Sequence, residues 1–546
     1  MLRSWVLPLC MFMSGYCGIV AELSLFQLAE SLLGNTITNL LYTMGVMMFF
    51  MGIGAWVANG RIMKKATMNG FIFLEIGLSF AVSSTIPLIT YLAGVSVVSP
   101  LFIFILFSAF IGCFIGMEIP IMQKLIHEET KEDIQKISSS VMMADYFGSL
   151  VGFAAFSLVL LYTLGLASSN LSAGAANLLS ASLIFVFYRQ KVSVLAKAVI
   201  VFAVFVITSL GLNIHSIMDK AEQNLYAHKI IWSKQTPYQK IILTDNSKEG
   251  NPKYDELHSN RYKLQYKEVD SFKIGANVLE VYQDKRDAYS LYLNGGLQFN
   301  TYDEAFYHEF LVHPALSLIE NPRSVLVLGG GDGMGIREIL KHKSLDKIVL
   351  VDLDEQMLKA FKESPLLQKF NAGALNNKRV EIIADDAWNY VRNTPQKFDC
   401  IIADFPDPHH SATAKLYTAQ FYKLVKRNLE EKGIFITQSS SPLLDNKAFL
   451  CIRKTLLDSG FNVLSCHIEM ESFFQWGFQI CSVSMQEKEM KSRLSNIDIN
   501  VETDFLNRDT VKASWLWPKN FYRHYPEIPV NDLMSLKLLQ MYHSKR

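Results

Sequence analysis

Seven long apolar runs in the first part of this chain constrain its fold more than any other feature. Their approximate ranges are 5–28, 37–58, 71–93, 99–122, 141–164, 171–188 and 194–214. A helix needs roughly 20 apolar residues to cross a bilayer, and most of the runs reach that length. The first run carries Glu22 and six more follow it, which is not the pattern of a cleaved signal peptide. The sequence therefore predicts an α-helical transmembrane bundle of about seven helices over residues 1–217.

Basic residues follow every second apolar run. They are Arg61, Lys64 and Lys65, then Lys124, Lys131 and Lys136, then Arg189, Lys191 and Lys197. The alternate connections, near 34–38, 94–99 and 165–170, contain none. By the positive-inside rule we expect a multi-pass cell-membrane protein with a cytoplasmic N-terminus. Seven spans would then place the remaining half outside the cytoplasm, away from adenosine cofactors, unless the sixth or seventh run is re-entrant or interfacial. The side of the soluble half stays open.

Four acidic residues fall within or near the ends of apolar runs: Glu22, Glu75, Glu118 and Asp145. A charged side chain at the centre of a bilayer costs roughly 3 kcal/mol or more, so we expect these residues to face the bundle interior. One interpretation is a path or sensor for organic cations. The other is that they are protonated, paired with polar groups or interfacial, as a few acids in many bundles are.

The second half of the chain contains two different patterns of short apolar segments. Over residues 221–300, short apolar runs separated by turn residues predict a small antiparallel β-subdomain; the runs are Lys240–Leu243, Tyr262–Tyr266, Val278–Tyr282 and Leu291–Leu293. Over residues 301–485, strand and helix patterns alternate and predict an open α/β sheet. Residues 486–546 are an aromatic C-terminal extension of mixed charge.

A glycine-rich turn opens the α/β part, in the segment SVLVLGGGDGMGIREILKHKSLDKIVLVDLD from Ser324 to Asp354. A strand runs into Gly329 and Gly331, a helix follows, and a second strand ends at Asp352. Glycines allow the backbone to approach a ligand closely, and Asp352 is placed to accept hydrogen bonds from a ribose diol. We therefore expect an adenosine-type ligand. Asp332, inside the turn, would repel a pyrophosphate and favours a cationic ligand.

Acidic residues also close the other predicted strands. Asp332, Asp352, Asp386, Asp404 and Asp407 each end a strand or the turn after it. The carboxyl ends of parallel strands meet at one edge, so these side chains should converge on one cleft. Such a cluster repels itself unless it binds cations. The alternative is that some of these residues cap the following helices, which is a common role for Asp.

Composition argues against several other functions. The net charge is +1 and basic and aromatic residues form no shared cluster, so nucleic acid is not an expected partner. The seven cysteines include no CxxC pair, so we predict neither a metal site nor a disulfide framework.

Several separated motifs resemble the polyamine aminopropyltransferase family, that is spermidine synthase, over roughly 236–483. They are TPYQ (Thr236–Gln239), YLNGGLQF followed by DEAFYHE (Tyr292–Glu309), LGGGDGMGIREILKH (Leu328–His342), VDLD (Val351–Asp354), ADDA (Ala384–Ala387), and ADFPDP (Ala403–Pro408) followed by LYTAQFY (Leu416–Tyr422). The preceding spans resemble the membrane-fused bacterial members. The resemblance implies a Rossmann-like fold of the class I methyltransferase type.

The resemblance also implies a role for each matching residue. Gln239, Gly329, Gly331, Asp352 and the pair Asp386 and Ala387 would bind the nucleoside. His308, Asp332 and Tyr307 would line the polyamine and aminopropyl site, Asp404 would accept the proton, and Asp407 would anchor the far amine. Three departures put the acceptor amine in doubt: Asn294 replaces an acid, Ala387 replaces a glycine, and the usual DPxGP run reads Asp407, Pro408, His409, His410 and Ser411. Phe473–Phe478 would supply aromatic walls or simply pack in the sheet.

The resemblance implies transfer of the aminopropyl group of decarboxylated S-adenosylmethionine, a co-substrate rather than a cofactor, to a diamine such as putrescine. The products would be spermidine and methylthioadenosine, with no metal required. Two alternatives stay open: a methyltransferase that uses intact S-adenosylmethionine, and a polyamine-binding sensor or transporter. The expected partners are these small molecules, the lipid bilayer and, as a further possibility, a second copy of the chain.

Overall fold

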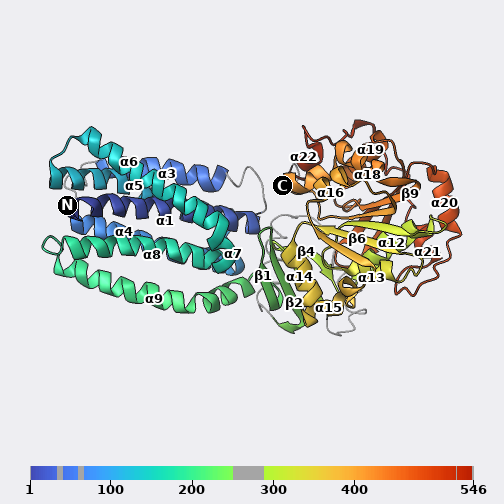
Figure 1. Ribbon diagram of the computed structural model, residues 1–546, viewed down its shortest axis with the longest axis horizontal. Coiled ribbons are helices and arrows are strands. Elements are labelled where there is room, and N and C mark those ends of the chain that lie inside the picture. The colour runs from blue at the N-terminus through green and yellow to red at the C-terminus, as the bar shows by residue number, and fades with distance from the viewer. Residues whose placement is uncertain are drawn as a thin grey trace. The chain divides into compact units, whose positions relative to one another are not determined.

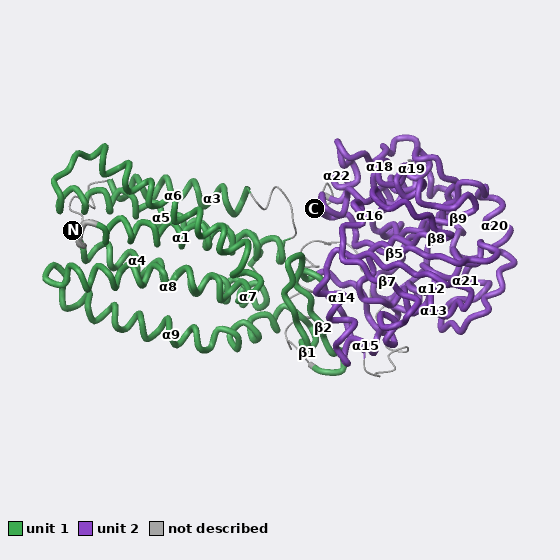
Figure 2. Tube along the Cα trace, viewed as in Figure 1, with its two compact units in different colours: residues 1–287, 293–295 green, residues 288–292, 296–546 purple. Residues whose placement is uncertain are grey.

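The computed structural model describes residues 2–33, 41–59, 67–96, 98–249, 288–523 and 525–543. Two compact units divide the chain (Figure 2). Unit 1 comprises residues 1–287 and 293–295, and unit 2 comprises residues 288–292 and 296–546. The predicted strands Tyr262–Tyr266 and Val278–Tyr282 lie outside the described residues.

Unit 1 is mainly a bundle of long apolar helices (Figure 1). The helical elements are α1 (Leu2–Leu33), η1 (Leu41–Gly45), α3 (Val46–Asn59), α4 (Met68–Val95), α5 (Pro100–Thr130), α6 (Ile134–Ala155), η3 (Phe156–Leu160), α7 (Leu161–Leu164), α8 (Leu166–Phe187) and α9 (Val194–Gln223). In the described residues, seven helical spans are long and apolar enough to cross a membrane, including α8 and α9. This confirms the predicted number of long apolar helices. Helix α9 continues to Gln223, past the apolar run that ends at residue 214.

Glycines bring pairs of these helices into backbone contact. A Cβ added at Gly148 of α6 would lie 2.0 Å from the carbonyl oxygen of Phe12 in α1. A Cβ added at Gly54 of α3 would lie 2.0 Å from the carbonyl oxygen of Cys113 in α5. Small residues at helix crossings are typical of membrane bundles, because association there depends on close packing.

A small antiparallel sheet follows the bundle in the chain. Its strands are β1 (His228–Gln235), β2 (Lys240–Glu249), β3 (Tyr289–Leu293) and β4 (Gly296–Asn300), in the order β1-β2-β3-β4. The predicted runs at 240–243 and 291–293 fall in β2 and β3.

Unit 2 is built on a seven-stranded sheet of order β10-β11-β9-β8-β5-β6-β7. The strands are β5 (Ser324–Gly329), β6 (Lys347–Asp352), β7 (Val380–Ala384), β8 (Phe398–Asp404), β9 (Leu429–Gln438), β10 (Asn462–Met470) and β11 (Phe474–Ser482). Strands β5 to β9 are parallel to their neighbours in this group, and β11 lies antiparallel between β9 and β10. The predicted alternation of strands and helices is present, and the sheet ends in the antiparallel pair of β10 and β11.

Helices pack on this sheet (Figure 1). The longer ones are α12 (Glu304–Ser317), α14 (Glu355–Glu363), α18 (Ala419–Arg427), α19 (Asn446–Asp458) and α20 (Glu487–Ser495); shorter ones are α13 (Met334–Leu340), α15 (Pro365–Asn371), η5 (Ala374–Asn376), α16 (Ala387–Asn393), α17 (Ser411–Ala414), η6 (Lys415–Tyr417), α21 (Arg508–Ala513), η7 (Tyr525–Glu527) and α22 (Lys537–His543). Part of the core is a cluster of apolar residues between strands and helices, including Leu326, Phe435 and Phe449. The C-terminal extension joins this core through Leu538 and Tyr542.

Candidate active site

The glycine turn lies at the carboxyl edge of the sheet, where β5 is flanked by β6 and β8. The parallel register places Gly329 beside Asp404. Gly330 has φ +71, and a Cβ there would lie 2.8 Å from Oδ2 of Asp404. A Cβ at Gly331 would lie 2.9 Å from Oδ2 of Asp352. Both carboxylates therefore reach the turn because these two positions have no side chain.

Asp352 is held at this edge by backbone donors. Its Oδ2 accepts a hydrogen bond from the N–H of Gly331 at 3.1 Å, and its Oδ1 accepts one from the N–H of Asp354 at 2.8 Å. Burial raises the pKa of Asp352 to about 6, against the effect of those donors. A ribose diol that donates to this carboxylate would favour its ionised form.

Asp386 caps the helix that begins with the buried residue Ala387. Its Oδ1 accepts from the N–H of Trp388 at 2.8 Å, and its Oδ2 contacts Nζ of Lys415 at 2.6 Å. The N–H of Asp385, one residue earlier, donates to the carbonyl of Asp352 at 3.1 Å. The alternative role of a helix cap is thus correct for Asp386. The hydrogen bond from Asp385 joins its loop to the end of β6.

Asp332, Asp404, Tyr307 and His308 form a second group at the same edge. The hydroxyl of Tyr307 donates to Oδ1 of Asp404 at 2.7 Å. Asp332 and Asp404 lie close enough to His308 for both carboxylates to stabilise its cation. Oδ1 of Asp332 also accepts from the N–H of Met334 at 2.9 Å, so this residue has a partial capping role as well.

Charges in this group perturb one another. Burial by itself would lower the pKa of His308, but the hydrogen bond and charge of Glu304 outweigh it and raise the pKa to about 9. The protonated form of His308 is therefore favoured. Burial raises the pKa of Asp332 to about 6, with His308 opposing the shift and Asp404 adding to it. Burial also raises the pKa of Tyr307, so its hydroxyl keeps its proton and remains a donor to Asp404.

A buried charge network fixes His308. Nδ1 of His308 lies 2.7 Å from Oε2 of Glu304. The guanidinium of Arg337 donates hydrogen bonds to both carboxylate oxygens of Glu304, at 2.9 and 3.0 Å. Arg337 also donates through Nε to Glu338 at 2.9 Å, and Glu338 contacts His313 at 3.1 Å. The network links the glycine-turn helix α13 to α12. Sequence reasoning missed Glu304 and Arg337, although both lie inside the quoted motifs.

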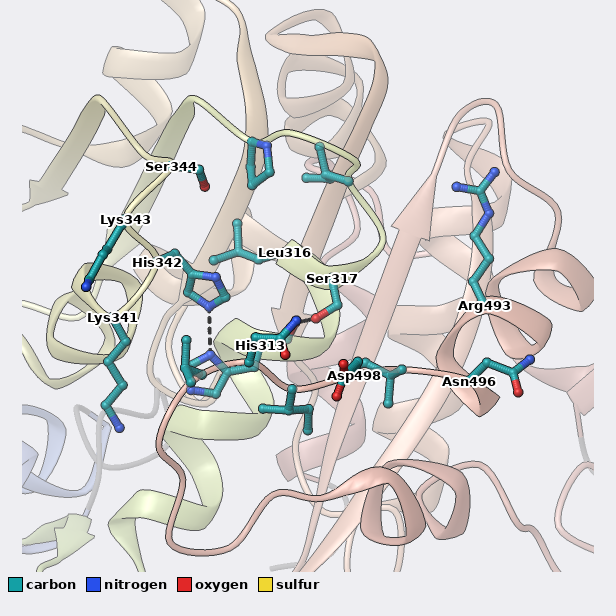
Figure 3. Close-up of a pocket in the computed structure, with 16 residues that line it drawn as sticks. His313, Leu316, Ser317, Lys341, His342, Lys343, Ser344, Arg493, Asn496 and Asp498 are labelled. Atoms are coloured by element: carbon teal, nitrogen blue, oxygen red, sulfur yellow. Dashed lines mark hydrogen bonds between the residues drawn. The ribbon is translucent and has the colours of Figure 1, made fainter.

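The same network ends at a separate pocket (Figure 3). The pocket has a volume of about 580 Å³, and His313 and Ser317, nearer the C-terminal end of α12, line it. His342 points toward His313, and their ring nitrogens are 2.9 Å apart. Lys341, Lys343 and Arg493 also line this pocket. None of the predicted site residues does, so the pocket is distinct from the carboxylate edge.

Asp407 lies in the loop after β8 and contacts residues far along the chain. Its Oδ1 accepts from the hydroxyl of Ser440 at 2.7 Å, and Nε2 of His409 is 3.8 Å from its Oδ2. The Ser440 hydroxyl is hydrogen-bonded to the hydroxyl of Tyr542. Burial raises the pKa of Asp407 to about 7, against the Ser440 hydrogen bond. The C-terminal extension thus reaches this carboxylate through one hydroxyl, which no sequence motif indicated.

Other contacts position the same loop. The Gln438 amide donates to the carbonyl of Phe405 at 2.8 Å and to the hydroxyl of Tyr417, and that hydroxyl donates to the carbonyl of Pro406 at 3.2 Å. The ring of His409 stands edge to face with Tyr542, with centroids 4.7 Å apart. Within the segment proposed as an aromatic wall, Phe478 packs against Tyr307 at 5.3 Å.

Gln239 belongs to unit 1, in the turn between β1 and β2. Its carbonyl accepts from the N–H of Thr236 at 2.9 Å, and its own N–H donates to the Thr236 hydroxyl at 3.1 Å. Asn294, which replaces an acid of the family pattern, has φ +49 and accepts from the N–H of Lys240 at 2.8 Å. Asn tolerates this left-handed conformation better than most residues, so it suits the position in the turn.

The strand order and the carboxylate edge define a class I methyltransferase-type α/β fold whose site is suited to cations. Residues 304–492 match the family described as Spermine/spermidine synthase domain. The polyamine aminopropyltransferase 2 of Aquifex aeolicus is 32% identical over 99% of this chain and 99% of its own length. The polyamine aminopropyltransferase of Leptospira interrogans is 31% identical over 96% and 95%. The solved spermidine synthase of Thermotoga maritima is 24% identical over 55% of this chain and 88% of that chain, with a TM-score of 0.42.

This chain belongs to the polyamine aminopropyltransferase family. It is a transferase of polyamine biosynthesis, as the resemblance of its motifs implied. Membership favours aminopropyl transfer over the methyltransferase alternative, since the relatives match along nearly the whole chain, spans included.

Proposed function

We propose that this enzyme transfers the aminopropyl group of decarboxylated S-adenosylmethionine to a diamine, putrescine first among the acceptors. The products are spermidine and methylthioadenosine. One observation carries the proposal: Asp332 and Asp404 lie together at the edge of the sheet, and among the described residues neither forms a salt bridge with a lysine or arginine. Neighbouring carboxylates without a lysine or arginine partner attract a cation from outside the protein.

The chemistry of the two substrates fits such a site. The decarboxylated donor carries a sulfonium and a propylammonium but no carboxylate, and putrescine is a dication at neutral pH. We assign Asp332 to the propylammonium of the donor, with Tyr307 and His308 lining that region. We assign Asp407 to the far ammonium of the acceptor. Complementary charge also favours these substrates over anionic or neutral analogues.

An ammonium has a pKa near 10 and must lose a proton before it can act as a nucleophile. In the proposed mechanism Asp404 accepts that proton through Oδ2, while Tyr307 holds Oδ1 at 2.7 Å. The amine nitrogen then attacks the methylene carbon next to sulfur. A C–N bond forms, the C–S bond breaks, and its electron pair returns to sulfur, which leaves neutral methylthioadenosine. The sulfonium is already an activated leaving group, so the displacement as written needs no metal ion.

The nucleoside is assigned to the glycine side of the edge. Asp352 accepts from the ribose hydroxyls, the backbone at Gly329 and Gly331 permits close approach, and Asp386 with Ala387 reads the adenine. Gln239 is proposed as a further nucleoside contact on the strength of its motif.

We further propose that the seven spans anchor the enzyme in a membrane, with the N-terminus in the cytoplasm. The proposed division is a polytopic domain at 1–217, a β-subdomain at 221–300, the catalytic domain at 301–485 and an extension at 486–546. A homo-oligomer is a further proposal.

The direct test is incubation of the purified full chain in detergent with labelled decarboxylated donor and separate diamines of three, four and five carbons. Mass spectrometry identifies the products. We expect spermidine and methylthioadenosine, with the four-carbon acceptor preferred. Methyl transfer from intact S-adenosylmethionine, with no aminopropyl product, would contradict the proposal. Preference for a longer or shorter diamine would overturn only the choice of putrescine.

A further inference from the structure

Within unit 1, three acids lie around the middle of α1; Glu75 and Glu118 are buried and Asp145 is half-buried. The hydroxyl of Ser14 in α1 donates to Oε1 of Glu75 in α4 at 2.9 Å. Glu118 in α5 interacts electrostatically with Glu75 and with Asp145 in α6. A Cβ added at Gly15 would lie 3.0 Å from Oδ1 of Asp145. Four helices therefore bring three acidic side chains to one level of the bundle.

These acids have no cationic partner among the residues that the structure describes. None of Glu75, Glu118 and Asp145 lies within 4.0 Å of a lysine, arginine or histidine nitrogen there. Lys124, further along α5 from Glu118, donates to the carbonyl of Ala58 instead. Glu75 and Glu118 are 0% and 1% exposed, and each keeps one carboxyl oxygen without a hydrogen-bond partner. An ionised acid in this setting is costly unless a cation neutralises it.

A seam of polar side chains continues from the acids between α4 and α8. Ser79 and Ser83 follow Glu75 along one face of α4, because residues four apart share a face. A Cβ at Gly174 of α8 would lie 2.1 Å from Oγ of Ser83, and the amide of Asn170 donates to the carbonyl of Val82. At the other end, the hydroxyl of Ser180 lies beside Glu75. Asn177 is one turn from both Gly174 and Ser180, so it faces the stretch of α4 between Ser79 and Glu75.

The polar groups of this seam are buried and unsatisfied. Ser79, Ser83, Ser180 and Asn177 are each 0% exposed. Within the described residues, the hydroxyls of Ser79 and Ser83 and both polar atoms of the Asn177 amide have no hydrogen-bond partner. Buried polar atoms are nearly always paired in proteins, and each unpaired one costs roughly 1–3 kcal/mol. So many at one place, beside acids without a cationic partner, leave donors and acceptors that a polar ligand would satisfy.

We propose that the seam is a binding site for an organic polycation, namely the polyamine substrate or product of the enzyme. The acids neutralise its ammonium groups, and the hydroxyls and the Asn177 oxygen accept hydrogen bonds from its N–H groups. The seam extends over about two turns of α4, roughly 12 Å, which suits an elongated amine better than a single metal ion. The choice of a polyamine rests on the proposed function, whereas the need for a cation rests on the bundle alone.

The test is equilibrium binding of labelled spermidine to the full chain in lipid nanodiscs. The double variant Asp404→Asn/Asp407→Asn serves as background, to suppress binding at the cleft of unit 2. We expect this background to retain one site, and addition of Glu75→Gln with Glu118→Gln to weaken it at least tenfold. Glu128→Gln, the same change at an exposed position of α5, is the matched control and should leave binding unchanged.

Folding and the identity of the cation are checked separately. Glu75→Gln/Glu118→Gln in the otherwise natural chain should keep transferase activity, which shows that unit 2 folds, and should elute in detergent at the volume of the natural chain, which reports on the bundle. Loss of all spermidine binding in the background variant would overturn the proposal. So would labelled sodium that binds in a Glu75-dependent way and is not displaced by spermidine. If the natural chain transfers no aminopropyl group yet binds spermidine through Glu118, the proposed function fails and this site stands.

Discussion

Two regions of this molecule gather buried or half-buried carboxylates, and the surrounding groups that stabilise these carboxylates differ. At the edge of the sheet in unit 2, a loop and the first turns of two helices supply backbone N–H donors to Asp332, Asp352 and Asp386. Glu304 has Arg337 and His308 as cationic partners. In the bundle of unit 1, Glu75 receives the Ser14 hydroxyl, and no cation pairs with Glu75 or Glu118 in the described part of the chain.

The difference follows from the local structure. A strand end leads into a loop whose N–H groups are free to point at a side chain, whereas helix interiors use their N–H groups in the helix itself. Acids placed mid-helix therefore depend on side chains or on a ligand. The carboxylates at the sheet edge are therefore partly compensated by the protein itself, whereas the acids of the bundle lack such internal compensation.

The largest expected effect is that of Asp404→Asn. Loss of the proton acceptor should lower kcat by about 10³-fold, within the usual range for general base catalysis, while methylthioadenosine still binds. Tyr307→Phe, which removes only the hydrogen bond to Asp404, should lower kcat by about tenfold. Single-turnover assays with a parallel nucleoside-binding titration make the measurement. Undiminished turnover in the Asn variant would exclude Asp404 as the base.

Neutralising an acid should have opposite consequences in the two regions. Glu304→Gln leaves Arg337 and His308 without their carboxylate and should destabilise unit 2 by about 3 kcal/mol. Glu118→Gln removes an acid that has no cationic partner and should change stability by less than about 1 kcal/mol or increase it. Calorimetry of the full chain in detergent measures both. Arg323→Met, which removes the exposed ion pair with Asp346, is the control and should lower the stability by about 0–1 kcal/mol.

Asp407→Asn should stabilise the ligand-free protein in a pH-dependent way. The folded pKa of Asp407 is raised from its ordinary 3.8 to about 7 by burial, so the folded state loses stability as pH rises between these values. The gain from the substitution should be on the order of 2 kcal/mol larger at pH 8 than at pH 5. Thermal unfolding at both pH values measures it. A gain that grows as pH falls would show that the assigned direction of the pKa shift is wrong.

The smallest expected effect is a release of protons when a diamine binds. Near pH 6.5, the carboxyls of Asp332 and Asp407 are partly protonated, because burial raises their pKa values to about 6 and about 7. A bound diamine favours the ionised forms, so binding should release a fraction of a proton. Calorimetric titrations in buffers of different ionisation enthalpy detect this. The release should shrink at pH 8.5 and in Asp407→Asn, and proton uptake would contradict the assignment.

The elements of this fold follow from local patterns. Apolar length predicted the seven helical spans, because a helix in lipid must satisfy its own backbone. Alternation of strands and helices predicted the sheet, and the acids at strand ends were expected at one edge because parallel strands end together. The boundaries were less predictable: α9 runs on to Gln223 through polar turns, and β9 begins at Leu429, ahead of its apolar run.

By itself, the sequence determined which segments become helices and strands and which acids close them, since spacing along the chain carries that information. Tertiary structure alone decided which distant residues meet. Tyr542 reaches Asp407 through Ser440, Arg337 of α13 grips Glu304 of α12, and Ser180 of α8 comes to Glu75 of α4. The physical reason is that such contacts depend on how whole elements pack, and the periodicity of a single segment does not predict which other segments it will pack against.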